Sequence, residues 1–141
     1  MIKLNNYITE AWSGVKKHTN NADIEAWCEE MGIKNYTING KGEIDVDLDV
    51  DLRHNTFKEL PYKFGKVTGF FTLMSNKNLT SLKNCPNYVG VYFDVDECIQ
   101  LDSLKGCPKE VNGNFCCYGC KRKFIEKEIR SYCKVGFNIY N

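Results

Sequence analysis

A 22-residue period in residues 57–122 constrains this 141-residue chain more than any other feature. Three segments align without a gap: FKELPYKFGKVTGFFTLMSNKN (57–78), LTSLKNCPNYVGVYFDVDECIQ (79–100) and LDSLKGCPKEVNGNFCCYGCKR (101–122). One leucine, one valine and one phenylalanine recur at fixed slots: Leu60, Leu82 and Leu104; Val67, Val89 and Val111; Phe71, Phe93 and Phe115. Such a period predicts one short supersecondary unit stacked on copies of itself, a solenoid. A solenoid presents a long, repetitive surface, which favours a binding scaffold.

The segments that flank the repeats have helical spacing of apolar residues. The first predicted helix covers residues 4–17, and a second follows with Asn20 or Asn21 as its N-cap and Gly32 as its terminator. A third has its apolar face over residues 125–133, is ended by Gly136 and precedes a short strand at 137–140. The expected core faces are Ile24, Trp27, Cys28 and Met31 in the second helix, and Ile125, Ile129, Tyr132 and Cys133 in the third. We therefore expect a single α+β domain: a helical N-terminal cap (1–35), the repeat array (36–123) and a C-terminal cap (124–141).

Residues 43–52 alternate acidic and apolar side chains, a pattern typical of a strand with one wet face. The acidic members are Glu43, Asp45, Asp47, Asp49 and Asp51. In one strand they would share a side at a spacing of about 7 Å. The hypotheses are a solvated face, a contact surface for a basic protein partner, and a metal site or a mimic of the nucleic-acid backbone. An EF-hand is excluded, because no counting frame has both the glycine and the final glutamate of that loop.

Each repeat also carries an asparagine or a cysteine three positions after an apolar strand residue. The pairs are Leu52–Asn55, Leu73–Asn76, Val95–Cys98 and Cys117–Cys120, and Leu-x-x-Leu follows at Leu79 and Leu101. This pattern resembles the leucine-rich repeat, in which the asparagine or cysteine turns inward and hydrogen-bonds the loop backbone of neighbouring coils. The resemblance implies a short leucine-rich-repeat-like β-solenoid. Because Pro86 and Pro108 disfavour a preceding helix, we expect an extended or turn-like convex side.

The sequence patterns "LTSLKNCP…V…F" and "LDSLKGCPKEV…F" are similar to those of short leucine-rich-repeat-like proteins encoded by tailed bacteriophages and gut bacteria. That resemblance implies a non-enzymatic protein-binding module in the bacterial host cytoplasm. One hypothesis is a phage-encoded inhibitor that occludes a host defence protein. The alternatives are a structural adaptor or self-associating phage protein, and a nucleic-acid binder that uses the basic C-terminal end.

The eight cysteines allow a second interpretation. Cys117 and Cys120 form a C-x-x-C that could contribute to a tetrahedral zinc site. The repeat offers a simpler account, because Cys98 and Cys120 are one period apart, as are Cys85 and Cys107. Cys117 takes the slot of an apolar core residue, where a thiol acts as a small hydrophobe. We expect buried structural thiols and no metal, cofactor or catalytic residue.

The net charge and its distribution along the chain limit which classes of partner are expected. The net charge is +1, but residues 22–60 hold ten acidic and four basic side chains, and residues 61–141 hold seven acidic and twelve basic. A chain of this balance has no strong overall attraction to nucleic acid or to a membrane surface, and no apolar run is long enough to span a bilayer. A protein partner is expected, with these contact residues: Asp45, Asp47, Asp49, Asp51, Phe70, Tyr92, Lys121 and Arg122.

Overall fold

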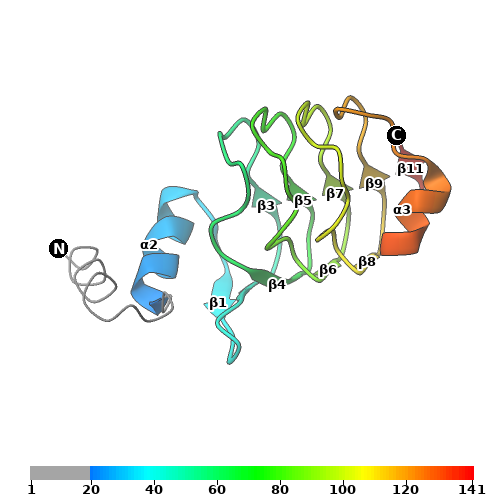
Figure 1. Ribbon diagram of the computed structural model, residues 1–141. Coiled ribbons are helices and arrows are strands. Elements are labelled where there is room, and N and C mark those ends of the chain that lie inside the picture. Colours follow the sequence, from blue (N-terminus) through cyan, green and yellow to red (C-terminus); the bar gives the residue numbers. More distant parts are fainter. Residues whose placement is uncertain (1–19) are drawn as a thin grey trace.

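A computed structural model describes residues 20–141 and confirms the solenoid, which has about four coils and two sheets (Figure 1). The predicted helix over residues 4–17 lies outside the described residues. In chain order the elements are α2 (Asn21–Glu30), β1 (Tyr36–Ile38), β2 (Ile44–Val46), β3 (Val50–Asp51), β4 (Phe64–Val67), β5 (Phe71–Thr72), β6 (Tyr88–Val89), β7 (Phe93–Asp94), β8 (Glu110–Val111), β9 (Phe115–Cys116), α3 (Glu126–Tyr132), β10 (Lys134–Val135) and β11 (Ile139–Tyr140).

Each coil contributes one short strand to each sheet. Sheet A has the order β1-β2-β4-β6-β8-β10 and sheet B the order β11-β9-β7-β5-β3. Neighbouring coils pair in parallel, and within residues 20–141 only β1 is antiparallel, to β2. Parallel strands in successive turns of a solenoid place equivalent residues directly above one another.

The repeat slots form the core as continuous ladders. In sheet A, Val67 pairs with Val89 and Val89 with Val111. In sheet B, Phe71 pairs with Phe93 and Phe93 with Phe115. Each of these side chains is 0% exposed, and Leu60, Leu82 and Leu104 are buried with them. The alignment of the three repeats therefore predicted the inward-facing positions correctly.

The asparagine and cysteine slot also lies inside the coil, as predicted. The Asn76 side-chain amide donates to the carbonyls of Leu52 and Leu73, each at 2.8 Å. The Cys98 thiol donates to the Leu73 carbonyl and the Cys120 thiol to the Val95 carbonyl, both at 3.3 Å. These side chains add a second donor to turn carbonyls that already accept within their own coil: the Asn76 backbone amide donates to the Leu73 carbonyl at 3.1 Å and the Cys98 backbone amide to the Val95 carbonyl at 3.3 Å. The slot therefore ties each turn to the next coil.

Helix α2 lies at the N-terminal end of the array (Figure 1). Asn20 is its N-cap and accepts from the Ala22 amide at 2.8 Å. Ile24 and Cys28 are buried, and the Trp27 ring lies 6.0 Å from the Phe64 ring between centroids. Gly32 follows the helix at a φ of +71°, which explains why a glycine ends it.

The segment after the third repeat is a further coil rather than a helix alone. Strand β10 pairs with β8 and strand β11 with β9, both in the register of the preceding coils. This confirms a last strand within 137–140. The prediction that the helix extends toward Gly136 is wrong, because α3 ends at Tyr132 and β10 follows.

Two core assignments in this coil are also wrong. Ile125 is 58% exposed because it precedes α3 in extended conformation, where helical spacing no longer applies. Tyr132 is 40% exposed at the last turn. Ile129 and Cys133 are buried as predicted, and Phe124 fills the core position that Ile125 does not.

The expected single strand over residues 43–52 is divided by a corner. Ile44–Val46 belongs to sheet A and Val50–Asp51 to sheet B. Between them Leu48 has a φ of +127° and is 58% exposed, although the alternation predicted it inside. A period of two does not show where a coil turns, because the residues on both sides of the corner alternate in the same way.

Glycine is required where successive corners come closest. A Cβ built on Gly113 would lie 1.8 Å from the Val91 carbonyl oxygen, whereas one built on Gly40 would meet no atom within 4 Å. We expect Gly113→Ala to lower the free energy of unfolding by about 1–3 kcal/mol, because the corner must move apart. The control Gly40→Ala should change it by less than about 0.5 kcal/mol. Urea denaturation measures both, and equal midpoints would contradict the packing described here.

Candidate interaction surface

The outward face of sheet B and the corner before it carry an aromatic stack. Phe70 and Tyr92 occupy the same slot in successive coils, directly before Phe71 and Phe93. Their ring centroids lie 4.8 Å apart at an interplanar angle of 9°. Both side chains are half-buried, so they present a rigid apolar surface with one phenol hydroxyl. This confirms the predicted shared slot, and such a surface suits a contact anchor.

Carboxylates border this stack on sheet B. Asp51 binds the Arg53 guanidinium through both oxygens, at 2.9 and 2.8 Å, and hydrogen bonding from Arg53 lowers the pKa of Asp51. Asp94, in the same slot as Asp51 two coils later, accepts from the Thr72 hydroxyl at 3.2 Å and from the Asp96 amide at 2.8 Å. Burial raises the pKa of Asp94 and of Asp96. These two partly desolvated carboxylates would gain from a cationic group on a partner.

Three of the four predicted aspartates are used to hold the first corner. Asp45 accepts from the Lys66 amide at 2.8 Å, and Asp49 accepts from the Phe70 amide at 3.0 Å. Asp47 accepts from the Thr68 hydroxyl at 3.0 Å. The corner also separates Asp45, on sheet A, from Asp51, on sheet B. The four carboxylates therefore do not form one row, and the expected common spacing is wrong.

The predicted basic pair, Lys121 and Arg122, lies apart from the aromatic stack, in the loop between β9 and α3. Arg122 binds the Glu128 carboxylate through two bonds at 2.9 and 2.6 Å. Its guanidinium also lies 4.4 Å from the centroid of the Phe124 ring. Lys121 is 4.0 Å from Asp102. Both side chains are exposed, but Arg122 is fixed by Glu128 and Phe124, whereas the Lys121 side chain has only the 4.0 Å contact with Asp102 among the described residues.

Sequence reasoning missed several residues of this surface. Asp94, Asp96 and Tyr118 extend it along sheet B, and Tyr118 is 64% exposed. Leu48, Val91 and Phe137 are exposed and occupy the same corner position in every second coil. Backbone hydrogen bonds at the corners connect this position from one coil to the next. The 22-residue period could have predicted these surface positions, because each of these residues lies a fixed number of positions from the valine or phenylalanine ladder.

The cysteines occupy the slots that the repeat predicts. Cys117 is buried in the core, while Cys120 donates to the Val95 carbonyl. Burial raises the pKa of Cys117 to about 12 and that of Cys120 to about 11, so both are thiols at neutral pH. Within residues 20–141 no three side chains of His, Cys, Asp or Glu are grouped to hold a metal ion.

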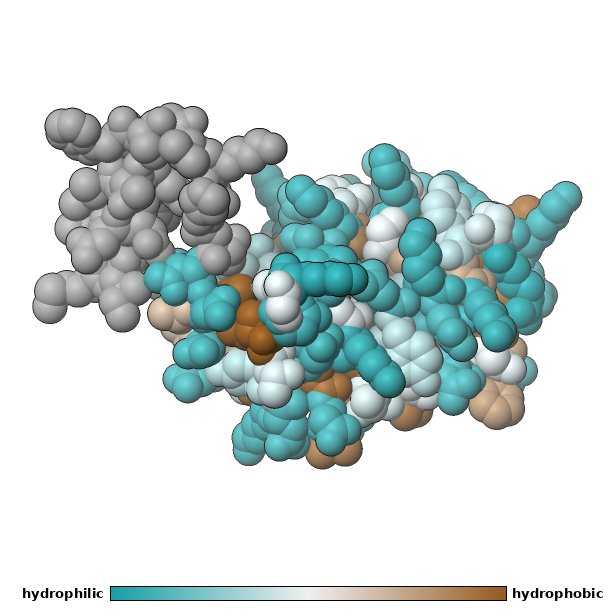
Figure 2. Space-filling view, turned by 90° about the horizontal axis from the view of Figure 1, so that it is seen from below, coloured by the Kyte–Doolittle hydropathy of each residue, from teal (hydrophilic) through white to brown (hydrophobic). Residues whose placement is uncertain are grey.

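The opposite face differs in character. Seen from below, the side that carries β4, β6 and β8 is largely hydrophilic (Figure 2). Its outward residues include Lys66, whose ammonium lies 5.2 Å from the centroid of the Tyr88 ring. In the described part of the chain, neither helix has the length and apolarity to cross a bilayer.

Comparison with known proteins adds no family: no family model, no curated protein and no solved structure matches this chain.

Proposed function

We propose that this chain is a non-enzymatic protein-binding scaffold. The observation that carries the proposal is the rigid stack of Phe70 and Tyr92 beside the partly desolvated carboxylates of Asp94 and Asp96. An aromatic anchor bordered by polar groups is typical of a protein contact surface. The resemblance to phage-encoded repeat proteins suggests a bacterial host protein as the partner, which the scaffold would inhibit by occluding its surface.

We also infer a structural role for the two helices as caps. Ile24 and Cys28 of α2 and Ile129 of α3 are buried against an end of the apolar core. A solenoid needs such cover, because its terminal coils would otherwise expose their core to water. The coils between the helices then display the binding surface.

The test is affinity purification of a partner from a bacterial host lysate, followed by quantitative binding of the purified pair. We expect Tyr92→Ala to raise the Kd about 10- to 100-fold, as for a central aromatic anchor. Tyr88→Ala is the matched control, since Tyr88 is an equally half-buried tyrosine on sheet A of the same coil. Equal affinity of the two variants, or a lack of any stoichiometric partner, would contradict the proposal.

A further inference from the structure

Both sheets end in an edge strand at the C-terminal side of the solenoid. These strands are β10 in sheet A and β11 in sheet B. At the other end of sheet A, the antiparallel strand β1 covers β2. An edge strand presents unpaired backbone groups, and proteins normally protect such edges with charged side chains, with bulges or with a covering element.

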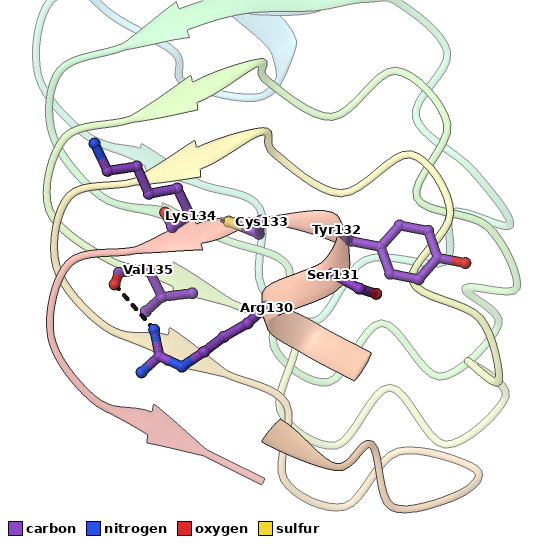
Figure 3. Close-up of a pocket in the computed structure, with 6 residues that line it drawn as sticks. All are labelled: Arg130, Ser131, Tyr132, Cys133, Lys134 and Val135. Atoms are coloured by element: carbon purple, nitrogen blue, oxygen red, sulfur yellow. Dashed lines mark hydrogen bonds between the residues drawn. The ribbon is translucent and has the colours of Figure 1, made fainter. Parts of the chain in front are cut away.

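The edge of β10 is protected. The Lys134 amide donates to the carbonyl of Lys109, the residue before β8, and the Gly136 amide donates to the carbonyl of Val111 in β8, both at 2.9 Å. The Val135 carbonyl lies between them and accepts from the Arg130 guanidinium of α3 at 3.3 Å, across a shallow hollow of about 440 Å³ (Figure 3). Glu126 holds the same guanidinium through Nε at 2.9 Å. With Lys134 exposed beside it, this edge carries two cations.

The edge of β11 has no such protection. The carbonyls of Asn138 and Tyr140 accept from the amides of Phe115 and Cys117, at 2.9 and 2.8 Å. In a pair of parallel strands, the residue between two residues that bond the neighbouring strand directs its own N–H and C=O away from that strand. The backbone groups of Ile139 therefore face outward, and no side chain of residues 20–141 hydrogen-bonds them.

The side chains around this edge are apolar and exposed. Residues 135–141, VGFNIYN, contain no charge and no proline. Phe137 is 70% exposed and Tyr140 is 51% exposed. An uncharged, aromatic edge of this kind accepts a further strand more readily than the cationic edge of β10 beside it.

We propose that β11 is a docking edge, to which an extended, acidic segment of a partner protein adds as a sixth strand of sheet B. The inference rests on the proposed function as a protein-binding scaffold. Strand addition supplies main-chain hydrogen bonds to Ile139, and the exposed rings of Phe137 and Tyr140 offer apolar contact to side chains of the segment.

Charge selects the acidic segment as the occupant. Residues 121–134 hold six basic and two acidic side chains. Both acidic residues, Glu126 and Glu128, are paired with arginines, whereas Lys123, Lys127 and Lys134 make no ion pair within the described chain. Lys127 lies in α3, Lys134 in β10 and Lys123 in the segment before α3. Figure 1 places α3 at the same end of the array as β11. A second copy would bring the same cations together, which disfavours self-pairing.

The experiment uses the full chain and an acetylated, amidated heptapeptide of alternating glutamate and valine. Amide NMR should show the Ile139 amide shifting and exchanging at least about 10-fold more slowly on binding, as expected for a newly formed backbone bond. The lysine–valine counterpart should bind at least about 10-fold more weakly, because of the lysines at this end of the array. A glutamate peptide with N-methylated valines should lose binding, since it lacks the edge donors. Equal binding of all three peptides, or shifts at Tyr92 without any at Ile139, would overturn the proposal.

Two variants at exposed corner positions complete the test. Phe137→Glu should weaken binding of the acidic peptide about 10-fold or more through like-charge repulsion. Val91→Glu is the control, because Val91 holds the same corner slot two coils earlier and is likewise exposed. Light scattering of the free chain checks for a second copy on the edge, and a doubled mass would overturn the assignment to a partner segment. If a purified partner is lost with Tyr92→Ala but unaffected by Phe137→Glu, the edge inference fails while the proposed function stands.

Discussion

Leu82→Asp is expected to unfold the repeat array. Leu82 is 0% exposed and lies between Leu60 and Leu104, its equivalents in the adjoining coils. Losing the buried leucine costs about 2–5 kcal/mol, and an unpaired carboxylate in its place adds several more. The sum approaches the whole stability of an ordinary domain, about 5–15 kcal/mol.

Circular dichroism and thermal denaturation measure this outcome. Thr80→Asp is the matched control, because it adds the same carboxylate two residues away at an exposed position. The next coil already carries Asp102 in that slot, so the control should fold. A folded Leu82→Asp protein with the melting temperature of the unmodified chain would show that the leucine slot is not the core.

The second large effect is expected at Phe93. Its ring contacts Phe71 and Phe115, with centroids 6.2 and 5.2 Å away, at the centre of the phenylalanine ladder. Phe93→Ala should lower the free energy of unfolding by about 3–5 kcal/mol, because the cavity has rigid walls in the coils on both sides. Phe137→Ala, at a ring that is 70% exposed, should change it by less than about 0.5 kcal/mol.

A double-mutant cycle tests whether the ladder is coupled. Phe93→Ala and Phe115→Ala should show an interaction energy of about 0.5–3 kcal/mol, as expected for residues in contact. The pair Phe93→Ala and Phe57→Ala should be additive, because Phe57 contacts Trp27 at the other end of the core. Urea denaturation supplies the four free energies of each cycle, and additivity in both cycles would contradict the stacked arrangement.

The repeat was sufficient to predict the interior of the molecule. The valine, phenylalanine and leucine slots and the asparagine–cysteine slot are all inside, because a fixed period requires equivalent residues to meet equivalent surroundings. Helix α2 was also predictable, since its cap at Asn20 and its terminator at Gly32 are local signals.

The corners could not be predicted in the same way. The alternation around Leu48 continues through a turn at positive φ, so the aspartates were assigned to one row although they lie on two sheets. Ile125 was misplaced because helical spacing does not reveal where a helix starts. The surface at Asp94 and Tyr118 was missed because outward residues differ from coil to coil, and only the register relates them.

The way the coils are joined also limits how such a molecule can change in length. In sheet A, Val67 pairs with Val89 and Val89 with Val111, and the corner amides likewise bond from one turn to the next. Removal of residues 79–100 would bring Val67 against Val111 and Phe71 against Phe115, and duplication would bring Val89 against a second copy of itself, so both ladders would continue. An insertion of a few residues inside a strand would instead misalign all turns beyond it. A solenoid of this kind therefore gains or loses length in whole turns, and the length of its exposed surface changes in the same steps.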